Sequence, residues 1–195
     1  MNAALPSHLR RVVTDGSDRG EWMRARSRGI TATDVAKLST PRSIDSAAWE
    51  KLHGSSFTGN AFTRHGTERE PVIAAWVLRE HGIEPSRALF HAETDMRHLA
   101  TPDGLVLREA GTLELAEIKT TNKAWRTIPR NYMRQIWWQQ YVLGAERTLM
   151  VWERHENFVP VGDPECRWVD RDENEIERLV SLAGRLIDSL IARSN

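Results

Sequence analysis

Two short segments constrain this chain most: residues 101–104 (Thr-Pro-Asp-Gly) and residues 117–119 (Glu-Ile-Lys). Pro102 pushes the residue before it toward extended backbone, and the Asp-Gly dipeptide that follows marks a bend before an apolar run. A hairpin with Gly111 in its turn then leads into a second strand. A carboxylate in a turn therefore precedes a strand that carries a second carboxylate and an amine. This layout is typical of a metal-dependent enzyme that cleaves phosphodiesters.

Side chains alternate between the two faces of a strand, which sorts the residues of the second strand. One face holds Leu113, Leu115, Glu117 and Lys119, and the other holds Glu114, Ala116 and Ile118. If the hairpin brings Asp103 beside the end of this strand, Asp103 and Glu117 can hold a hard cation, and the carbonyl of Ile118 can add a third oxygen. Lys119 would then orient the attacking water or offset developing charge. The alternative is a solvated ladder of ion pairs on a hairpin.

Three further segments flank this motif: residues 26–34 (Arg-Ser-Arg-Gly-Ile-Thr-Ala-Thr-Asp), 66–71 (Gly-Thr-Glu-Arg-Glu-Pro) and 132–135 (Tyr-Met-Arg-Gln). In this order they resemble the lambda exonuclease / YqaJ-like viral recombinase family, within the PD-(D/E)XK nuclease superfamily. The resemblance runs from roughly Trp22 to Phe158. It implies an α/β, restriction-endonuclease-like (PD-(D/E)XK) core, in which a central mixed β-sheet is flanked by helices.

The resemblance assigns site residues one position at a time. Asp103, Glu117, Lys119 and Gln135 match catalytic positions, and Glu70 matches a helical glutamate that helps hold a metal. Two Mg²⁺ or Mn²⁺ ions would be held by Asp103, Glu117, Glu70 and the Ile118 carbonyl. The residues at the positions that bind a 5′-terminal phosphate are Arg26, Thr33 and Thr101. Family members often have a second glutamine two residues after the first, where this chain has Trp137.

A physical argument supports part of the phosphate site. Thr31 with Asp34 resembles a capping box, so Thr33 would lie in the first turn of a helix, where free N–H groups favour an anion. Arg26 would add a bidentate partner. Ordinary helix capping beside surface arginines is the alternative.

Local patterns predict the elements. We expect helices over 22–27, 31–38, 46–53, 62–81 with an irregularity near Pro71, 132–143, and a last amphipathic helix whose apolar stripe runs from Ile176 to Ile191. We expect strands over 89–93, 97–100, 104–107, 112–120, 148–155, 157–161 and 167–169. A length of 195 residues fits one nuclease domain over 1–195, with an N-terminal helical part and the C-terminal amphipathic helix.

Formal net charge is zero, with 27 basic and 27 acidic residues, so any basic surface must be local. Residues 119–134 carry only basic charges, whereas residues 153–177 are mostly acidic, which predicts opposite signs at opposite ends. The DNA-binding candidates in the basic stretch are Lys123, Trp125, Arg126 and Arg130. A solvated loop and helix face is the alternative.

Cys166 is the single cysteine of the chain, which excludes an internal disulfide and suits a reducing cytoplasm. Residues 1–13 lack an apolar core, so we expect neither a signal peptide nor a membrane span.

By resemblance, we expect a 5′-to-3′ exonuclease acting on one strand of linear duplex DNA in phage-type recombination. Family relatives form homotrimers and feed a single-strand annealing protein in phage recombination, so the resemblance implies a homotrimer and such a partner. The expected location is the cytoplasm of a bacterial host. An endonuclease or single-strand nuclease of the same superfamily is one alternative, although many of those use several cysteines for an iron–sulfur cluster. A DNA-binding module without catalysis is the other.

Overall fold

The computed structural model describes residues 6–54 and 59–194. Its helices are η1 (a 3-10 helix, Ser7–Arg11), α1 (Arg19–Ser27), α2 (Ala32–Lys37), α3 (Pro41–His53), α4 (Ala61–His81), α5 (Arg130–Leu143) and α6 (Glu173–Ser194). Its strands are β1 (Val12–Thr14), β2 (Ile30–Thr31), β3 (Glu84–Pro85), β4 (Leu89–His91), β5 (His98–Ala100), β6 (Gly104–Leu107), β7 (Leu113–Thr121), β8 (Arg147–Glu156), β9 (Val159–Pro160) and β10 (Glu165–Asp170).

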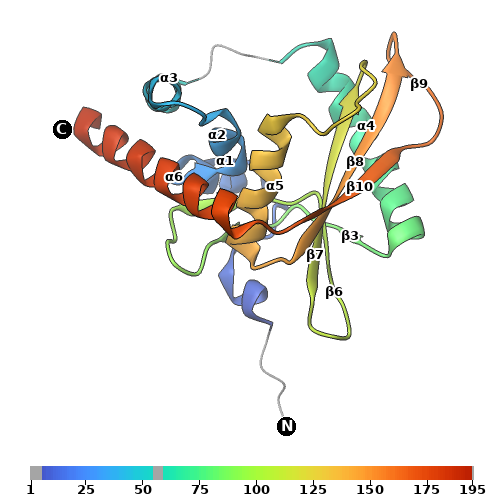
Figure 1. Ribbon diagram of the computed structural model, residues 1–195, viewed down its shortest axis with the longest axis horizontal. Coiled ribbons are helices and arrows are strands. Elements are labelled where there is room, and N and C mark those ends of the chain that lie inside the picture. The colour runs from blue at the N-terminus through green and yellow to red at the C-terminus, as the bar shows by residue number, and fades with distance from the viewer. Residues whose placement is uncertain (1–5, 55–58, 195) are drawn as a thin grey trace.

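The strands form a larger and a smaller sheet (Figure 1). In the larger sheet the order is β10-β8-β7-β6-β3, with β9 paired to β8 outside this path. The central strand β7 is antiparallel to β6 and parallel to β8, so the sheet is mixed. The smaller sheet has the order β1-β4-β5-β2. The predicted α/β architecture, with a central mixed sheet and flanking helices, is confirmed.

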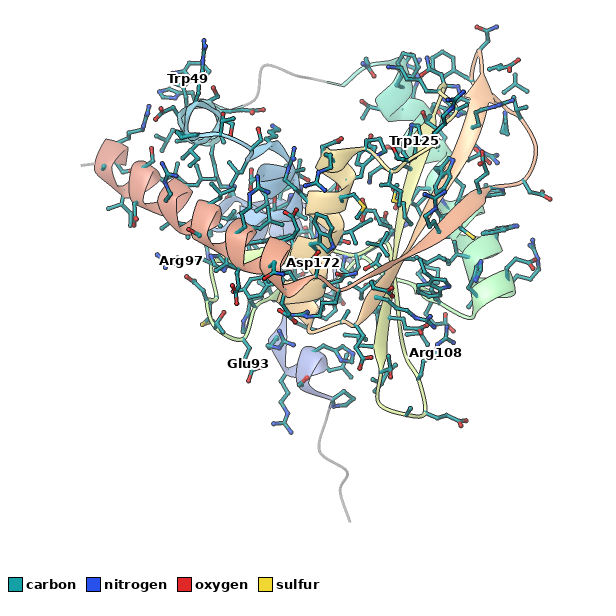
Figure 2. The ribbon with its side chains drawn as sticks, viewed as in Figure 1. Trp49, Glu93, Arg97, Arg108, Trp125 and Asp172 are labelled. Carbon is teal, nitrogen blue, oxygen red and sulfur yellow. The ribbon has the colours of Figure 1, made fainter. Side chains whose placement is uncertain are left out.

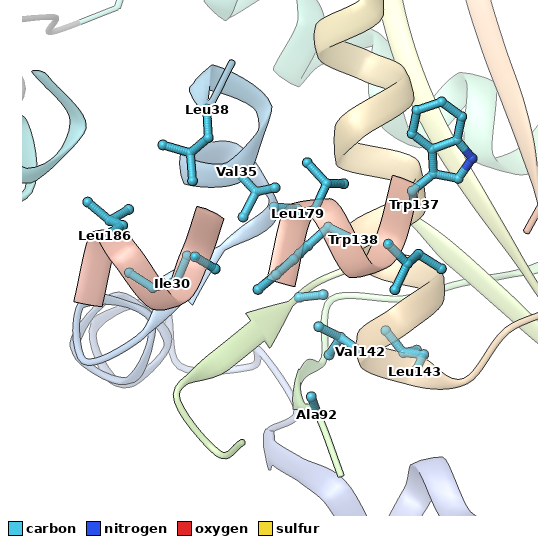
Figure 3. Close-up of a cluster of buried hydrophobic side chains, with 14 of the residues drawn as sticks. Ile30, Val35, Leu38, Ala92, Trp137, Trp138, Val142, Leu143, Leu179 and Leu186 are labelled. Atoms are coloured by element: carbon cyan, nitrogen blue, oxygen red, sulfur yellow. The ribbon is translucent and has the colours of Figure 1, made fainter. Parts of the chain in front are cut away.

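Helices bury both faces of β7 because its inward-facing side chains are apolar on each side. Leu113 and Leu115 pack with α5, α2 and α6 in the main core, where Trp138 is fully buried (Figure 3). Ala116 and Ile118, on the opposite face, pack against α4. Both faces of the motif strand are therefore covered by helices before any polar contact is considered.

Most predicted elements are present, and their ends follow capping residues. Strand β6 matches its predicted range, and β7 is shifted by one residue. Helix α1 begins at Arg19 rather than Trp22 because the Asp18 side chain accepts the Glu21 N–H. Helix α3 begins at Pro41 rather than Ser46 because Thr40 forms a capping box.

Three expectations differ more. Helix α4 continues through Pro71, where we expected an irregularity. Pro71 has no N–H to donate to the Thr67 carbonyl one turn earlier, and both residues line a cavity. The strand expected over 157–161 shrinks to β9, because Asn157 and Phe158 have positive φ angles and form a turn. Strands β1, β2 and β3 and the short helix η1 were not predicted.

Among residues 6–54 and 59–194, no helix has both the length and the hydropathy that a membrane span requires.

Candidate active site

Asp103 is anchored to the middle of β7 by its backbone and its side chain. Its N–H donates to the Ala116 carbonyl (3.1 Å), and its Oδ2 accepts the Ile118 N–H (2.7 Å). Gly104 fits closely between β3 and β7, because a Cβ there would lie 3.0 Å from the Glu84 carbonyl oxygen and 3.3 Å from the Ala116 Cβ. The turn therefore delivers a carboxylate beside Glu117, the residue between the two anchoring positions.

Glu117 is 1% exposed, and its two carboxylate oxygens accept hydrogen bonds from α5. Gln135 Nε2 donates to Oε1 at 2.6 Å, and Gln139 Nε2 donates to Oε2 at 2.7 Å. The glutamines are four residues apart, so they project from one side of the helix. Lys119, two residues along β7, forms an ion pair with Oε1. Glu117 is thus held from the helix and from its own strand.

The charged side chains of Asp103, Glu117 and Lys119 interact with one another in a largely buried site. Burial and the negative charge of Glu117 raise the pKa of Asp103 well above its usual value. Burial opposes the charged form of Lys119, but Glu117 and Asp103 outweigh it and raise the pKa of Lys119. Two adjacent carboxylates with one amine leave a site that favours additional positive charge.

Glu114 lies on the other face of β7, as predicted from strand alternation. Its carboxylate is 2% exposed and accepts hydrogen bonds from Arg108 and Arg147, both at 2.8 Å. Arg108 lies near the β6–β7 hairpin (Figure 2). The Arg147 guanidinium stacks 4.0 Å from the centre of the Trp168 ring. Glu114 therefore has a structural role in the sheet.

A cavity of about 550 Å³ opens over the Asp103–Glu117 pair. Its lining includes the carboxylates and their partners on one wall, namely Glu70, Asp103, Glu117, Lys119 and Gln135. The rest of the lining forms a second wall, which comes from α1, the start of α2, the loop before β4 and the turn after β5, and includes Arg19, Trp22, Arg26, Thr33, Arg87 and Thr101. The predicted catalytic and phosphate-binding residues therefore share one cavity.

The predicted phosphate-binding residues are linked through Trp22. Arg26 Nη2 donates to Thr33 Oγ1 (2.8 Å), and its guanidinium lies 4.7 Å from the centre of the Trp22 ring. Trp22 Nε1 in turn donates to Thr101 Oγ1 (3.3 Å). Burial lowers the pKa of Arg26, although Asp34 and Glu117 oppose this. Arg26 and two hydroxyls thus form one polar group that faces the cavity.

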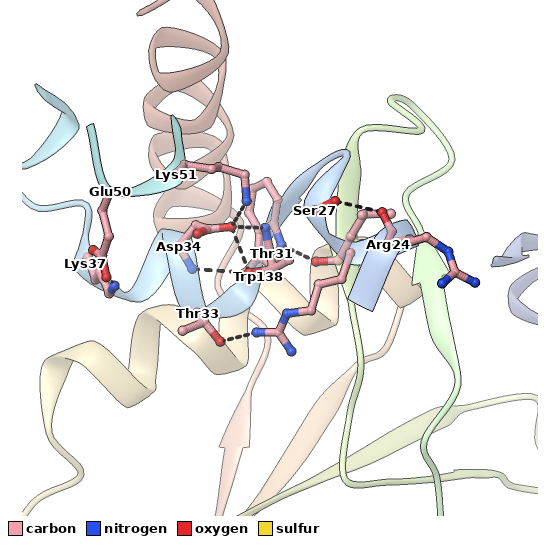
Figure 4. A network of polar contacts seen from close by, with 11 residues as sticks. Arg24, Ser27, Thr31, Thr33, Asp34, Lys37, Glu50, Lys51 and Trp138 are labelled. Carbon is pink, nitrogen blue, oxygen red and sulfur yellow. Dashed lines mark hydrogen bonds and ion pairs between the residues drawn. The ribbon is translucent and has the colours of Figure 1, made fainter. Parts of the chain in front are cut away.

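The turn that carries Thr33 is held by the predicted capping box. The Thr31 side chain accepts the Asp34 N–H, and the Asp34 carboxylate accepts the Thr31 N–H at 2.8 Å (Figure 4). Lys51 from α3 also pairs with Asp34 at 2.8 Å. This network fixes Thr33 at the cavity wall.

The other predicted DNA-binding residues lie outside this cavity lining. Lys123 and Arg126 are exposed, whereas Trp125 (Figure 2) is half-buried. The Trp125 ring centre lies 5.4 Å from that of Trp152. Arg130 pairs with Glu175 of α6 at 2.9 Å. The expectation that the basic and acidic stretches occupy opposite ends is therefore wrong, because α5 packs beside α6 and brings them together.

The donor set suits a hard cation that takes oxygen ligands. Within the described residues, no three acidic, histidine or cysteine side chains are grouped as a metal site. Asp103 and Glu117 would therefore need the Ile118 carbonyl, Glu70 and water to complete a coordination shell. Glu70 is exposed and lines the same cavity. The buried Glu117 carboxylate and the half-buried Asp103 carboxylate lie side by side, and their mutual repulsion, which raises the pKa of Asp103, favours an ion here.

Sequence reasoning missed Gln139, Trp22, Arg19 and Arg87 as residues of this site. The spacing of Gln135 and Gln139 was a usable signal, because positions i and i+4 share a helix face. Trp22 and Arg19 share a face with Arg26 by the same rule. Arg87 carries no such signal, since its position depends on the loop before β4.

Comparisons with known proteins agree with this geometry. A family model described as the YqaJ-like viral recombinase domain matches residues 21–146. The chain is similar to an alkaline exonuclease from Laribacter hongkongensis, with a TM-score of 0.71 and 25% identity over 89% of this chain and 93% of that chain. A structure of that exonuclease in complex with dAMP gives a TM-score of 0.70 at 25% identity, with 89% and 93% coverage.

A phage-related exonuclease from Haemophilus somnus 129PT has a similar fold, with a TM-score of 0.60 and 13% identity over 86% of this chain and 96% of that chain. No curated protein matches the chain in a sequence search.

Proposed function

The chain belongs to the YqaJ-like viral recombinase family, and from this premise we propose that it is a metal-dependent exonuclease that degrades one strand of linear duplex DNA from its 5′ end. The observation that carries the proposal is the convergence of Asp103, Glu117 and Lys119 beneath a cavity whose other wall holds Arg26. The similarity to an alkaline exonuclease supports the same reaction class. In the proposed hydrolysis, the wall with the carboxylates would hold the metal, and the wall with Arg26 would hold the terminal phosphate of the substrate.

Asp103 and Glu117, with Glu70 and the Ile118 carbonyl, would hold Mg²⁺ or Mn²⁺, with two ions per site. When bound, such ions polarise the phosphate and lower the pKa of the attacking water. The residues of the chain supply positioning. Gln135 and Gln139 hold the Glu117 carboxylate in one orientation, and Lys119, a neighbour of both carboxylates, would orient the water or offset the developing negative charge.

The second wall accounts for the end preference that we propose. Arg26, Thr33 and Thr101 present one guanidinium and two hydroxyls, a combination that suits a terminal phosphate. Trp22 holds Arg26 and Thr101 together and limits their freedom. A 5′-phosphate bound there would place a neighbouring phosphodiester in the same cavity as Asp103 and Glu117.

The remaining parts of the proposal rest on family resemblance. They are action on double-stranded DNA ends, a homotrimer, cooperation with a single-strand annealing protein in recombination, and a cytoplasmic location in a bacterial host. Lys123, Trp125, Arg126 and Arg130 are proposed to contact the duplex outside the cavity. The exposure of Lys123 and Arg126 supports this for those two.

Lys119→Ala tests the proposed chemistry. We expect cleavage of 5′-phosphorylated linear duplex to fall by at least about 100-fold, because the amine acts on the reaction. DNA binding, measured by fluorescence anisotropy in a chelator, should stay within about threefold. Lys37→Ala is the matched control, since that exposed lysine lies outside the cavity lining. Unfolding of Lys119→Ala, or full activity in it, would contradict the assigned role.

Removal of the metal tests the donor set. We expect EDTA to abolish cleavage by the wild type and added Mg²⁺ to restore it, because two adjacent carboxylates alone cannot offset the developing negative charge. Asp103→Asn should raise the Mg²⁺ concentration required for half-maximal rate. Cleavage that persists in excess chelator would refute metal dependence.

A further inference from the structure

The α1 wall of the cavity carries more positive charge than a single phosphate needs. Arg19, Trp22 and Arg26 are spaced three and four residues apart, so they lie on one face of α1, and all of them line the cavity. Arg26 is engaged by Thr33 and Trp22. Seven residues of α-helix rise about 10 Å, so the backbones of Arg19 and Arg26 are separated by about that distance along the helix axis.

Arg87 comes to the same end of the cavity from the loop between β3 and β4. Gly16, in the turn before α1, packs directly on its backbone, because a Cβ at Gly16 would lie 2.3 Å from the Arg87 carbonyl oxygen. The preceding Ser86 N–H donates to the Asp103 carbonyl (3.0 Å). The position of Arg87 is therefore tied both to the start of α1 and to the turn that carries Asp103.

Neither Arg19 nor Arg87 has a hydrogen-bond or ion-pair partner within residues 6–54 and 59–194, and both side chains are exposed. The nearby acids are occupied by backbone groups: the Asp15 carboxylate accepts the Ser17 N–H (2.8 Å), and that of Asp18 accepts the Glu21 N–H (2.9 Å). Two arginines without protein partners on a cavity wall are suited to bidentate contacts with phosphate.

We propose that Arg19 and Arg87 form a second phosphate subsite, which binds an internal phosphodiester of the substrate strand while Arg26 binds its terminal phosphate. This proposal rests on the proposed function. DNA carries one phosphate per about 3.4 Å of axis on each strand, so a wall about 10 Å long spans more than one phosphate. A mononucleotide would occupy only the Arg26 group, whereas an oligonucleotide would occupy both.

The test uses binding without catalysis. The double variant Arg19→Ala/Arg87→Ala and the wild type are titrated in EDTA with dAMP and with a 5′-phosphorylated linear duplex, over a series of salt concentrations. Each duplex phosphate contact contributes about 0.9 to the slope of log affinity against log salt. Because Arg19 and Arg87 bind one internal phosphodiester, we expect the double variant to lose about 0.9 of slope, and roughly tenfold in duplex affinity near 0.1 M salt. Its affinity for dAMP should be unchanged.

The matched control is Arg24→Ala/Arg42→Ala, which removes equal charge from exposed arginines outside the cavity lining and should leave the duplex salt slope within about 0.3 of wild type. An unchanged salt slope in Arg19→Ala/Arg87→Ala, or an equal loss of dAMP and duplex affinity, overturns the subsite. Cleavage by the wild type with Mg²⁺ is measured in parallel. Absence of that cleavage together with the expected slope change would refute the exonuclease and keep the subsite.

Discussion

Glu117 is the residue around which the site is organised. Both of its oxygens are hydrogen-bonded, and Gln139, which is fully buried, holds the oxygen that Gln135 does not reach. The other amide atom of Gln139, Oε1, has no protein partner within the described part of the chain. Gln139 therefore acts through Glu117, as a positioning residue.

Gln139→Leu should weaken metal binding. Loss of a group that orients a metal ligand typically costs about 10–100-fold in affinity or activity, and we expect the Mg²⁺ concentration for half-maximal rate to rise by that order. Calorimetric titration with Mg²⁺ measures the same effect without turnover. Gln140→Leu, which removes bonds to Thr148 and Val169, should lower stability but leave the Mg²⁺ dependence unchanged. Equal Mg²⁺ dependence in both variants would contradict the positioning role.

Glu114→Gln tests the assignment of strand faces. Burial alone would raise the pKa of Glu114, but hydrogen bonds from Arg147 and Arg108 outweigh it and lower that pKa. The ionised Glu114 carboxylate with its two arginines therefore stabilises the fold above the pKa that this carboxyl has in the unfolded chain. The contribution is lost as pH falls through the lower pKa that it has in the folded protein. We expect Glu114→Gln to lower the free energy of unfolding at pH 7 by about 2 kcal/mol, a figure limited by the partial exposure of both arginines. Nuclease activity should be retained.

Urea denaturation at pH 7 and at pH 3 measures this effect. The stability difference between Glu114→Gln and the wild type should shrink at the lower pH. A variant that keeps its stability but loses cleavage would place Glu114, and not Glu117, in the site.

At the scale of elements, α2 links folding to the proposed phosphate group. Thr31→Ala removes the capping box that holds the turn with Thr33, so we expect a loss of about 1 kcal/mol and a smaller preference for 5′-phosphorylated over 5′-hydroxyl ends. Thr40→Ala removes the corresponding capping box of α3 and should lower stability alone. Thermal unfolding and cleavage rates on the two substrates separate these outcomes. Loss of end preference in both variants would indicate a general effect of destabilisation.

Local sequence signals predicted the elements unevenly, for physical reasons. Strand β6 has an Asp-Gly bend before it and an apolar run, so its limits are local. The strands β1, β2 and β3 span two or three residues, and their pairing depends on distant partners such as His98 for Ile30. The relative position of the basic and acidic stretches also depends on distant partners, because the Arg130–Glu175 ion pair forms only where α5 packs against α6.

The candidate site was predictable where strand alternation decides it. Asp103, Glu117 and Lys119 follow from a turn and a strand, and family resemblance added Arg26, Thr33 and Thr101, which the structure brings to the same cavity. The contribution of Arg87 could not be predicted, because it depends on the packing of Gly16 against a loop distant in sequence.

For the whole molecule, a balanced formal charge coexists with a cavity that is lined by both acidic and basic side chains. The family resemblance predicts a homotrimer, and multi-angle light scattering should then give a mass three times the 22.3 kDa of one chain. A heterologous contact that closes into a ring would account for such an assembly. A monomer at working concentrations would refute it without affecting the chemistry of a single site.

The most direct test of the central claim is cleavage of matched duplexes in Mg²⁺. A linear duplex with a 5′-phosphate on one strand, the same duplex with 5′-hydroxyl ends, and a closed circle are incubated with the protein, and each strand carries its own label. We predict that the phosphorylated strand is degraded from its 5′ end, that the hydroxyl form is degraded more slowly, and that the circle is spared. Nicking of the circle would indicate an endonuclease, and no cleavage of any substrate would contradict the assignment of a catalytic site.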